Sequence, residues 1–112
     1  MFMGACMTVT QIINLLQKSV SDKSYDLVPT EKNRNSRRKY GLTIFEIEDF
    51  LKTITELDLY KGPEIDRDKP QEEVFIFIKE IFDGVNFYVK IKKDSSVKYD
   101  RIKIISCHEA LN

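Results

Sequence analysis

The sequence predicts one α+β domain, and three observations support that class. Residues 74–78 form the most hydrophobic run of the chain, rich in β-branched and aromatic residues, and Asp83-Gly84 soon afterwards is a strong β-hairpin signal. Two other stretches, 8–20 and 43–54, repeat hydrophobic residues at the spacing of an amphipathic helix. The whole chain, 1–112, is long enough for one hydrophobic core but not for two.

The first element is expected to be a helix from about Thr8 to Val20. Thr8 and Gln11 fit a capping box, in which each side chain accepts a hydrogen bond from the other residue's backbone N–H. The apolar stripe of this helix, which favours core packing over a partner surface, is Val9, Ile12, Ile13, Leu16 and Val20. Residues 1–7 are apolar but lack the basic start of a signal sequence, so they are predicted to be a frayed start.

A short strand, Tyr25 to Val28, is expected next, and Pro29 places it at a sheet edge because proline cannot donate to a strand ladder. A second helix is predicted from Glu31 to Tyr40, with Gly41 as the left-handed residue that ends it. No apolar stripe fixes this helix to a core, so it fits either a solvated surface helix or an arm that contacts phosphate. Its candidate phosphate ligands are Arg34, Arg37 and Arg38.

The third helix is predicted to begin after Thr43, which fits a capping box with Glu46. Its buried face is expected to be Ile47, Phe50, Leu51 and Ile54. Residues 60–68 are dense in glycine, proline and charge, so we expect them to form a loop with no long regular element. The hairpin turn at Asp83-Gly84 is expected to be type I′, which needs a positive φ at both residues.

Two strands after this turn carry the candidate site. From Val85 to Lys92 the chain alternates, with apolar residues on one face and Asn86, Tyr88, Lys90 and Lys92 on the other. The last strand, Tyr99 to Cys107, is expected to point Ile102, Ile104, Ser106 and then His108 to one face. The predicted common core is Ile47, Phe50, Leu51, Ile54, Ile76, Phe77, Phe87, Val89 and Ile104.

Composition excludes several classes of protein. No segment approaches the roughly 20 apolar residues that a membrane helix needs, and 42% hydrophobic with 32% charged residues fits a folded soluble domain. Two cysteines are too few for a disulfide framework, so we expect a cytoplasmic protein. One histidine with two scattered cysteines cannot build a zinc site, and residues 64–68 lack the glycine and glutamate of a calcium loop. No metal or cofactor is expected.

The zero net charge hides a pattern along the chain. Residues 1–42 carry seven Lys or Arg against three acids, a balance of +4. Residues 43–83 carry five against twelve, or −7, and residues 84–112 carry six against three, or +3. The two basic segments could assemble one positive patch for a polyanion, although an ordinary mixed surface explains the same counts.

Three blocks of the chain, taken in order, resemble the MqsR family of bacterial type II toxins: LVPTEKN at 27–33, LYKGPEIDRD at 59–68 and ISCHEA at 105–110. The resemblance covers roughly residues 24–110. It implies a RelE-like α+β fold, in which a curved antiparallel sheet packs against two or three helices. It also implies metal-independent cleavage of mRNA, and neutralisation by a cognate antitoxin, a helix-turn-helix protein encoded next to the toxin.

The family's catalytic positions fall on Lys61, Tyr88 and His108 of this chain, and a branch of the family carries lysine at the last position. A glutamine of the family has no clear counterpart, and Lys79 is the nearest polar residue. All four side chains are expected to open onto one concave face of the sheet. Contacts with RNA are expected from Arg34, Arg37, Arg38, Lys90 and Lys92.

These residue types suit RNA cleavage by attack of the 2′-hydroxyl, which needs a proton acceptor, a proton donor to the 5′-oxygen and cations. An imidazole can serve as acid or base near neutral pH. Each residue also has a structural alternative: His108 at the surface, Lys61 in a salt bridge to Glu64 or Asp66, and Tyr88 packed across the hairpin. The alternative function is therefore a catalytically inactive RelE-like module that binds a protein partner.

Overall fold

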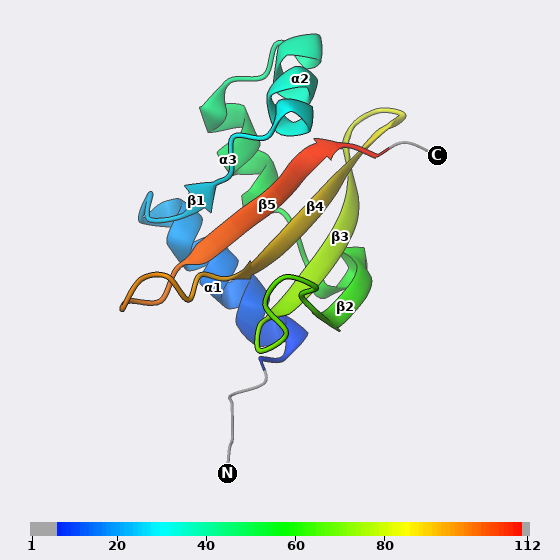
Figure 1. Cartoon of the computed structure of the whole chain (residues 1–112). Coiled ribbons are helices and arrows are strands. Elements are labelled where there is room, and N and C mark those ends of the chain that lie inside the picture. Colours follow the sequence, from blue (N-terminus) through cyan, green and yellow to red (C-terminus); the bar gives the residue numbers. More distant parts are fainter. Residues whose placement is uncertain (1–6, 111–112) are drawn as a thin grey trace.

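A computed structural model describes residues 7–110 as three α-helices and one five-stranded sheet (Figure 1). The frayed start predicted for residues 1–7 lies outside the described residues except for Met7. The helices are α1 (Val9–Ser21), α2 (Glu31–Tyr40) and α3 (Ile44–Lys52), followed by a single 3-10 turn, η1 (Glu56–Asp58). The strands are β1 (Asp26–Leu27), β2 (Leu59–Ile65), β3 (Glu73–Phe82), β4 (Val85–Lys93) and β5 (Ile102–Glu109).

The sheet has the strand order β1-β5-β4-β3-β2, and the α+β class predicted from the sequence is confirmed. The short strand β1 lies at an edge, as expected, but it pairs with β5 in parallel, whereas the other pairs are antiparallel. The sheet is therefore mixed: the expected antiparallel arrangement holds for β2 to β5 and is wrong for β1. Helices α1 and α3 cover one face, and α2 lies beyond β5 at the far edge (Figure 1). No helix of residues 7–110 covers the opposite face of β4 and β5 (Figure 1).

The core lies between α1, α3 and the covered face of the sheet. Its largest fully buried side chains include Phe75, Phe77 and Phe87. The predicted core is confirmed with one correction. Ile76 is 6% exposed but belongs to the opposite face, because neighbours along a strand point in opposite directions. Both predicted capping boxes, Thr8 with Gln11 and Thr43 with Glu46, are present.

Most of the segment predicted to be a loop, residues 60–65, belongs to the edge strand β2. It pairs with β3 from Leu59, opposite Phe77, to Ile65, opposite Glu73, with two irregularities in the register. Gly62 allows this pairing, because a Cβ atom there would lie 2.8 Å from the carbonyl oxygen of Val74. Local composition favoured a loop, but the long neighbouring strand supplied a hydrogen-bonding partner that composition alone does not reveal.

The hairpin between β3 and β4 turns at Asp83-Gly84, as predicted, but the turn is not type I′. Gly84 has φ 80°, whereas Asp83 has no positive φ. The register shifts between Glu80 and Phe82, so an extra residue near the turn absorbs the difference. The expected pairing of the two strands is unaffected.

Strand β5 contains a bulge that changes which of its residues are buried. Lys90 lies opposite Ser106 but Ile91 lies opposite Ile104, so Ile105 is an extra residue on β5. The expectation that Ile104, Ser106 and His108 share one face is therefore wrong. Beyond the bulge Cys107 points into the core, fully buried, and His108 points to the face without helices.

Helix α2 is attached to β5 by polar side chains rather than by an apolar stripe. Asn33 is fully buried and its side chain hydrogen-bonds to the backbone of Val28, Ile105 and Cys107. One turn later, the Ser36 hydroxyl accepts a hydrogen bond of 2.9 Å from the Glu109 N–H. These contacts fix a helix that the sequence left without an anchor, and they place its basic side chains beside the end of β5.

Candidate functional site

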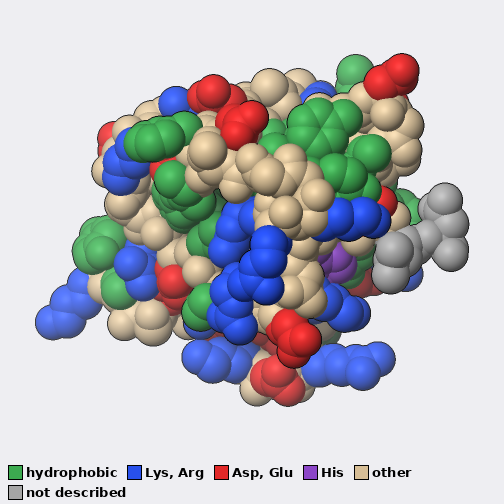
Figure 2. All heavy atoms as spheres, turned by 90° about the horizontal axis from the view of Figure 1, so that it is seen from above, with side chains coloured by type: hydrophobic (Ala, Val, Ile, Leu, Met, Phe, Trp, Pro, Cys, Tyr) green, Lys and Arg blue, Asp and Glu red, His purple; other side chains and the backbone are tan. Residues whose placement is uncertain are grey.

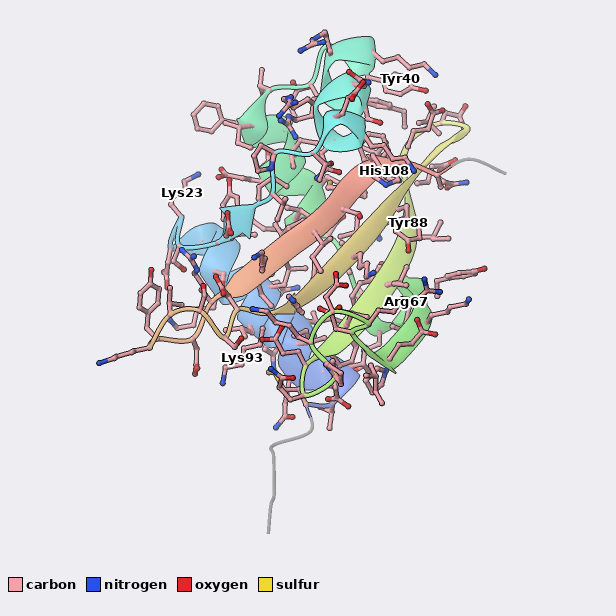
Figure 3. All side chains as sticks on the ribbon, in the orientation of Figure 1. Lys23, Tyr40, Arg67, Tyr88, Lys93 and His108 are labelled. Atoms are coloured by element: carbon pink, nitrogen blue, oxygen red, sulfur yellow. The ribbon has the colours of Figure 1, made fainter. Side chains whose placement is uncertain are left out.

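The exposed face of β4 and β5 brings four polar side chains together. Tyr88 lies opposite His108, and Lys90 lies opposite Ser106 in the next pair on the same face. The rings of Tyr88 and His108 stack with centroids 5.4 Å apart and planes 18° apart. Figure 3 shows both side chains at the end of the sheet nearest α2. The sequence predicted that Tyr88, Lys90 and His108 lie on this polar face, and the β5 bulge brings Ser106 to it as well.

One nitrogen of His108 is already engaged. Nδ1 lies 3.0 Å from the backbone carbonyl oxygen of Glu109. A carbonyl oxygen can only accept a hydrogen bond, so Nδ1 carries the proton in this contact. In the neutral imidazole, Nε2 is then the nitrogen with a lone pair, and it can accept a proton from a substrate.

Tyr88 is suited to the opposite task. Burial raises the pKa of its phenol, and the nearby Glu64 carboxylate and Tyr60 hydroxyl on β2 raise it further. All three causes disfavour the phenolate. Tyr88 therefore keeps its proton at neutral pH and can donate it.

Lys61 faces the same surface from β2. It lies opposite Ile76 of β3, which in turn lies opposite Lys90 of β4. Three strand spacings separate β2 from β5, or about 14 Å between backbones. Lys61 is exposed, its Nζ lies 5.6 Å from the centroid of the Tyr60 ring, and it forms no ion pair within residues 7–110. The alternative of a loop anchor paired with Glu64 or Asp66 is thus not observed in the described part of the chain.

Two predicted site lysines lie elsewhere. Lys79 pairs with Phe87 in the sheet and so belongs to the core-side face, where its ammonium group contacts Asp58 at 3.1 Å. The expectation that it joins Tyr88 on one concave face is therefore wrong. Lys92 does lie on the exposed face of β4, but it is only 7% exposed. Its ammonium group contacts Asp66 and Glu72, each at 2.7 Å, which leaves it unsuited to bind phosphate.

The partners of Lys92 belong to the segment between β2 and β3, which folds against the sheet. Ion pairs and a hydrogen bond from Ser95 to Glu72 tie this segment to β4 and its following turn. The hydrogen bond from Lys92 lowers the pKa of Asp66. Arg67, which the sequence analysis did not single out, is exposed on this segment (Figure 3). Residues 66–72 are mostly charged and contain one proline, so the sequence gave no signal that this segment would pack on the sheet.

The basic side chains of α2 differ in their accessibility. Arg38 is exposed and free of ion pairs among the described residues, whereas Arg34 donates to the Pro29 carbonyl. Arg37 is half-buried, and its Nη1 is buried without a hydrogen-bond partner in residues 7–110. Lys39 contacts Glu109 at 2.8 Å. Figure 2 shows Lys and Arg side chains gathered in the centre of the view, with the His108 side chain beside them.

One cavity lies away from these residues. A cavity of about 640 Å³ lies at the other end of the sheet, where Met7, Ile12, Phe75, Asp94 and Tyr99 are among its lining residues. Within residues 7–110, no group of three or more His, Cys, Asp or Glu side chains is placed to hold a metal ion. In the same residues, no helix combines the length and hydropathy needed to cross a membrane.

No family model, curated protein or solved structure matches this chain. The resemblance to the MqsR family therefore stays a prediction, carried by the three sequence blocks alone.

Proposed function

We propose that the protein is the toxin of a type II toxin–antitoxin pair, with a RelE-like fold, and that it cleaves mRNA without a metal ion. One observation carries the proposal. A proton acceptor, His108, and a proton donor, Tyr88, stack on one open face of the sheet beside Lys90 and the basic helix α2. RNA cleavage by its own 2′-hydroxyl needs these groups and no cofactor.

In the proposed reaction, His108 Nε2 accepts the proton of the 2′-hydroxyl while O2′ forms a bond to phosphorus. Tyr88 donates its phenolic proton to the 5′-oxygen as the bond between phosphorus and that oxygen breaks. The products are a 2′,3′-cyclic phosphate and a 5′-hydroxyl. The contact of Nδ1 with the Glu109 carbonyl supports the first role, and the stacking of the Tyr88 phenol on the His108 ring supports the second.

Lys90 is the best-placed cation for the negative charge that develops on the phosphoryl oxygens. It follows Tyr88 by two residues on the same face and lies opposite Ser106, whereas Lys61 approaches from the far edge of the surface. We therefore assign transition-state stabilisation to Lys90 and phosphate binding to Lys61 and Arg38. This division departs from the family pattern, which implies a catalytic role for Lys61.

A cognate antitoxin is the expected protein partner. The support is the resemblance, together with large apolar side chains that water reaches on α3, η1 and β2. Phe45 is 67% exposed, Leu57 96% and Ile65 70%. Burying such side chains is the usual source of affinity in a protein interface.

The proposal is tested by inducing the gene in bacteria. Wild-type protein should arrest growth, and His108→Ala should not, at equal accumulation judged by immunoblot. Co-expression of the neighbouring helix-turn-helix gene should restore growth. If neither protein arrests growth although both fold, the alternative of an inactive binding module is favoured.

A further inference from the structure

We propose that Asn33 and Ser36 are positioning residues, which hold the β5 bulge and thereby keep His108 on the exposed face of the sheet. The use of His108 in RNA cleavage rests on the proposed function. Its position, in contrast, can be measured without RNA.

The side chain of Asn33 spans the bulge. Its amide nitrogen donates to the carbonyl oxygens of Val28, at 2.9 Å, and of Ile105, at 3.1 Å. Its amide oxygen accepts a hydrogen bond of 2.8 Å from the Cys107 N–H. Both groups of this buried amide are thus hydrogen-bonded, and two of the three bonds go to β5 at its bulge, to Ile105 and Cys107.

Helix α2 takes the place that a neighbouring strand would occupy. The pairing of β1 with β5 ends at Ile104, and Val28 donates to the carbonyl oxygen of that residue at 3.0 Å. Beyond this point, the outer edge of β5 meets Asn33 and then Ser36, which accepts from the Glu109 N–H. Residues three apart share one face of a helix, so a single turn of α2 serves both positions.

The alternative arrangement of β5 is defined by its sequence. Without the bulge, the period-two pattern that starts at Ile102 and Ile104 would turn His108 inward and Cys107 outward. That arrangement is disfavoured because the Asn33 amide and the bulged backbone satisfy each other's hydrogen bonds. Removing the amide leaves the Ile105 carbonyl and the Cys107 N–H without these partners. The free energy of the bulged form then rises, and the straight form of β5 competes with it.

Measurements on Cys107 and His108, which lie on opposite faces of the sheet, distinguish the bulged form of β5 from the straight form. Burial raises the pKa of the Cys107 thiol to about 12, and the thiolate is the reactive form. The chain has one histidine, so the NMR signals of its ring protons belong to His108. Nuclear Overhauser effects between these protons and the Tyr88 ring report the stack. The full chain carrying Cys6→Ser leaves Cys107 as its single thiol.

In that background, Asn33→Ala should speed alkylation of Cys107 by iodoacetamide by at least about tenfold, since the thiolate fraction rises tenfold for each pKa unit lost. The Overhauser effects between His108 and Tyr88 should disappear. Asn35→Ala, at an exposed position of the same helix, should leave both readouts unchanged. Ser36→Ala should weaken the stack in the same direction and to a smaller extent.

General loss of stability is separated by Leu16→Ala, a core variant on α1. Transient unfolding should speed its alkylation in proportion to the stability lost, while the folded molecules keep the His108–Tyr88 signals. If Asn33→Ala does not fold, Ser36→Ala and Asn33→Asp, which keeps the acceptor for the Cys107 N–H, carry the test. Folded variants of both positions that keep the stack and the protected thiol would overturn the proposal. Loss of the stack in Asn33→Ala, with wild-type protein inactive on RNA, would uphold it and reject the proposed function alone.

Discussion

Tyr88 and His108 stack across the β4–β5 pair, with ring centroids 5.4 Å apart, although their neighbours in sequence, Phe87 and Cys107, are fully buried in the core. The bulge at Ile105 makes this possible by shifting the alternation of β5 by one residue. A group that can donate a proton and a group that can accept one therefore lie side by side on one exposed surface. A phenol that holds its proton lies beside an imidazole whose Nε2 can accept one.

Replacing Tyr88 by phenylalanine isolates the proton of the phenol. The variant keeps the ring that stacks on His108, so the melting temperature should stay within the error of the wild-type value. The cleavage rate at saturating RNA should fall by about 10²-fold or more, the usual cost of losing a general acid. Single-turnover cleavage measures this, and an unchanged rate would remove Tyr88 from proton transfer.

Lys90 and Lys92 provide a matched pair on one strand. Lys90→Gln should slow cleavage with little effect on stability, because Lys90 is assigned to the phosphoryl charge. Lys92→Gln should destabilise the protein by roughly 3–5 kcal/mol, because it leaves the half-buried Asp66 and the buried Glu72 carboxylates without their cation. Urea unfolding and cleavage assays of both variants test the assignment, which is contradicted if the two exchange phenotypes.

The sequence predicted the parts of the fold that depend on local signals. The capping residues Thr8 and Thr43 start their helices as expected, and Asp83-Gly84 marks the hairpin. Strand β2 was missed because glycine, proline and charge suggest a loop unless the neighbouring strand is known. The anchoring of α2 was missed because Asn33 and Ser36 act through hydrogen bonds, which hydrophobic periodicity does not detect.

The sequence predicted only part of the candidate site, because local patterns locate regular strands but not bulges or ion pairs between distant residues. The alternation of β4 places Tyr88 and Lys90 correctly, since that strand is regular between Phe87 and Ile91. A bulge leaves no mark on hydrophobic periodicity, so His108 was expected to share a face with Ile104, which it does not. Lys92 was expected to contact RNA because its partners, Asp66 and Glu72, are 20 or more residues away in sequence and gave no local signal of an ion pair.

Arg38 should contribute to RNA binding through its charge alone. Arg38→Ala should weaken binding and reduce the slope of log affinity against log salt by about 0.7, the value for one phosphate contact with single-stranded RNA. Lys18→Ala, which removes an exposed cation on α1, is the control. Fluorescence anisotropy at several salt concentrations measures both, and an unchanged slope in Arg38→Ala would place RNA elsewhere.

Asp94 should give the protein a defined sensitivity to acid. Burial alone would raise its pKa, but hydrogen bonds from Ser96 and Arg101 outweigh burial and lower the pKa from 3.8 to about 2. A carboxyl whose pKa is lower in the folded state stabilises the fold at any pH above its pKa in the unfolded state. This contribution is lost as the pH falls from about 4 to about 2. Asp94→Asn should therefore cost about 2 kcal/mol at neutral pH and almost nothing near pH 2.

The exposed carboxylate of Asp100, which contacts Lys93, provides the control for that prediction. Asp100→Asn should change stability little at any pH, because exposed ion pairs contribute little. Urea unfolding between pH 2 and 7 measures both variants. Equal stability of Asp94→Asn and wild type at neutral pH would contradict the role given to Asp94.

The most direct test of the central claim is cleavage of a long RNA by the purified protein in the presence of EDTA. Wild-type protein should produce fragments with 2′,3′-cyclic phosphate and 5′-hydroxyl ends, and His108→Ala should cleave about 10²–10⁴-fold more slowly. Its melting temperature should match that of wild type, which separates lost chemistry from lost structure. Equal cleavage by the two proteins, or wild-type cleavage that requires a divalent metal ion, would contradict the mechanism.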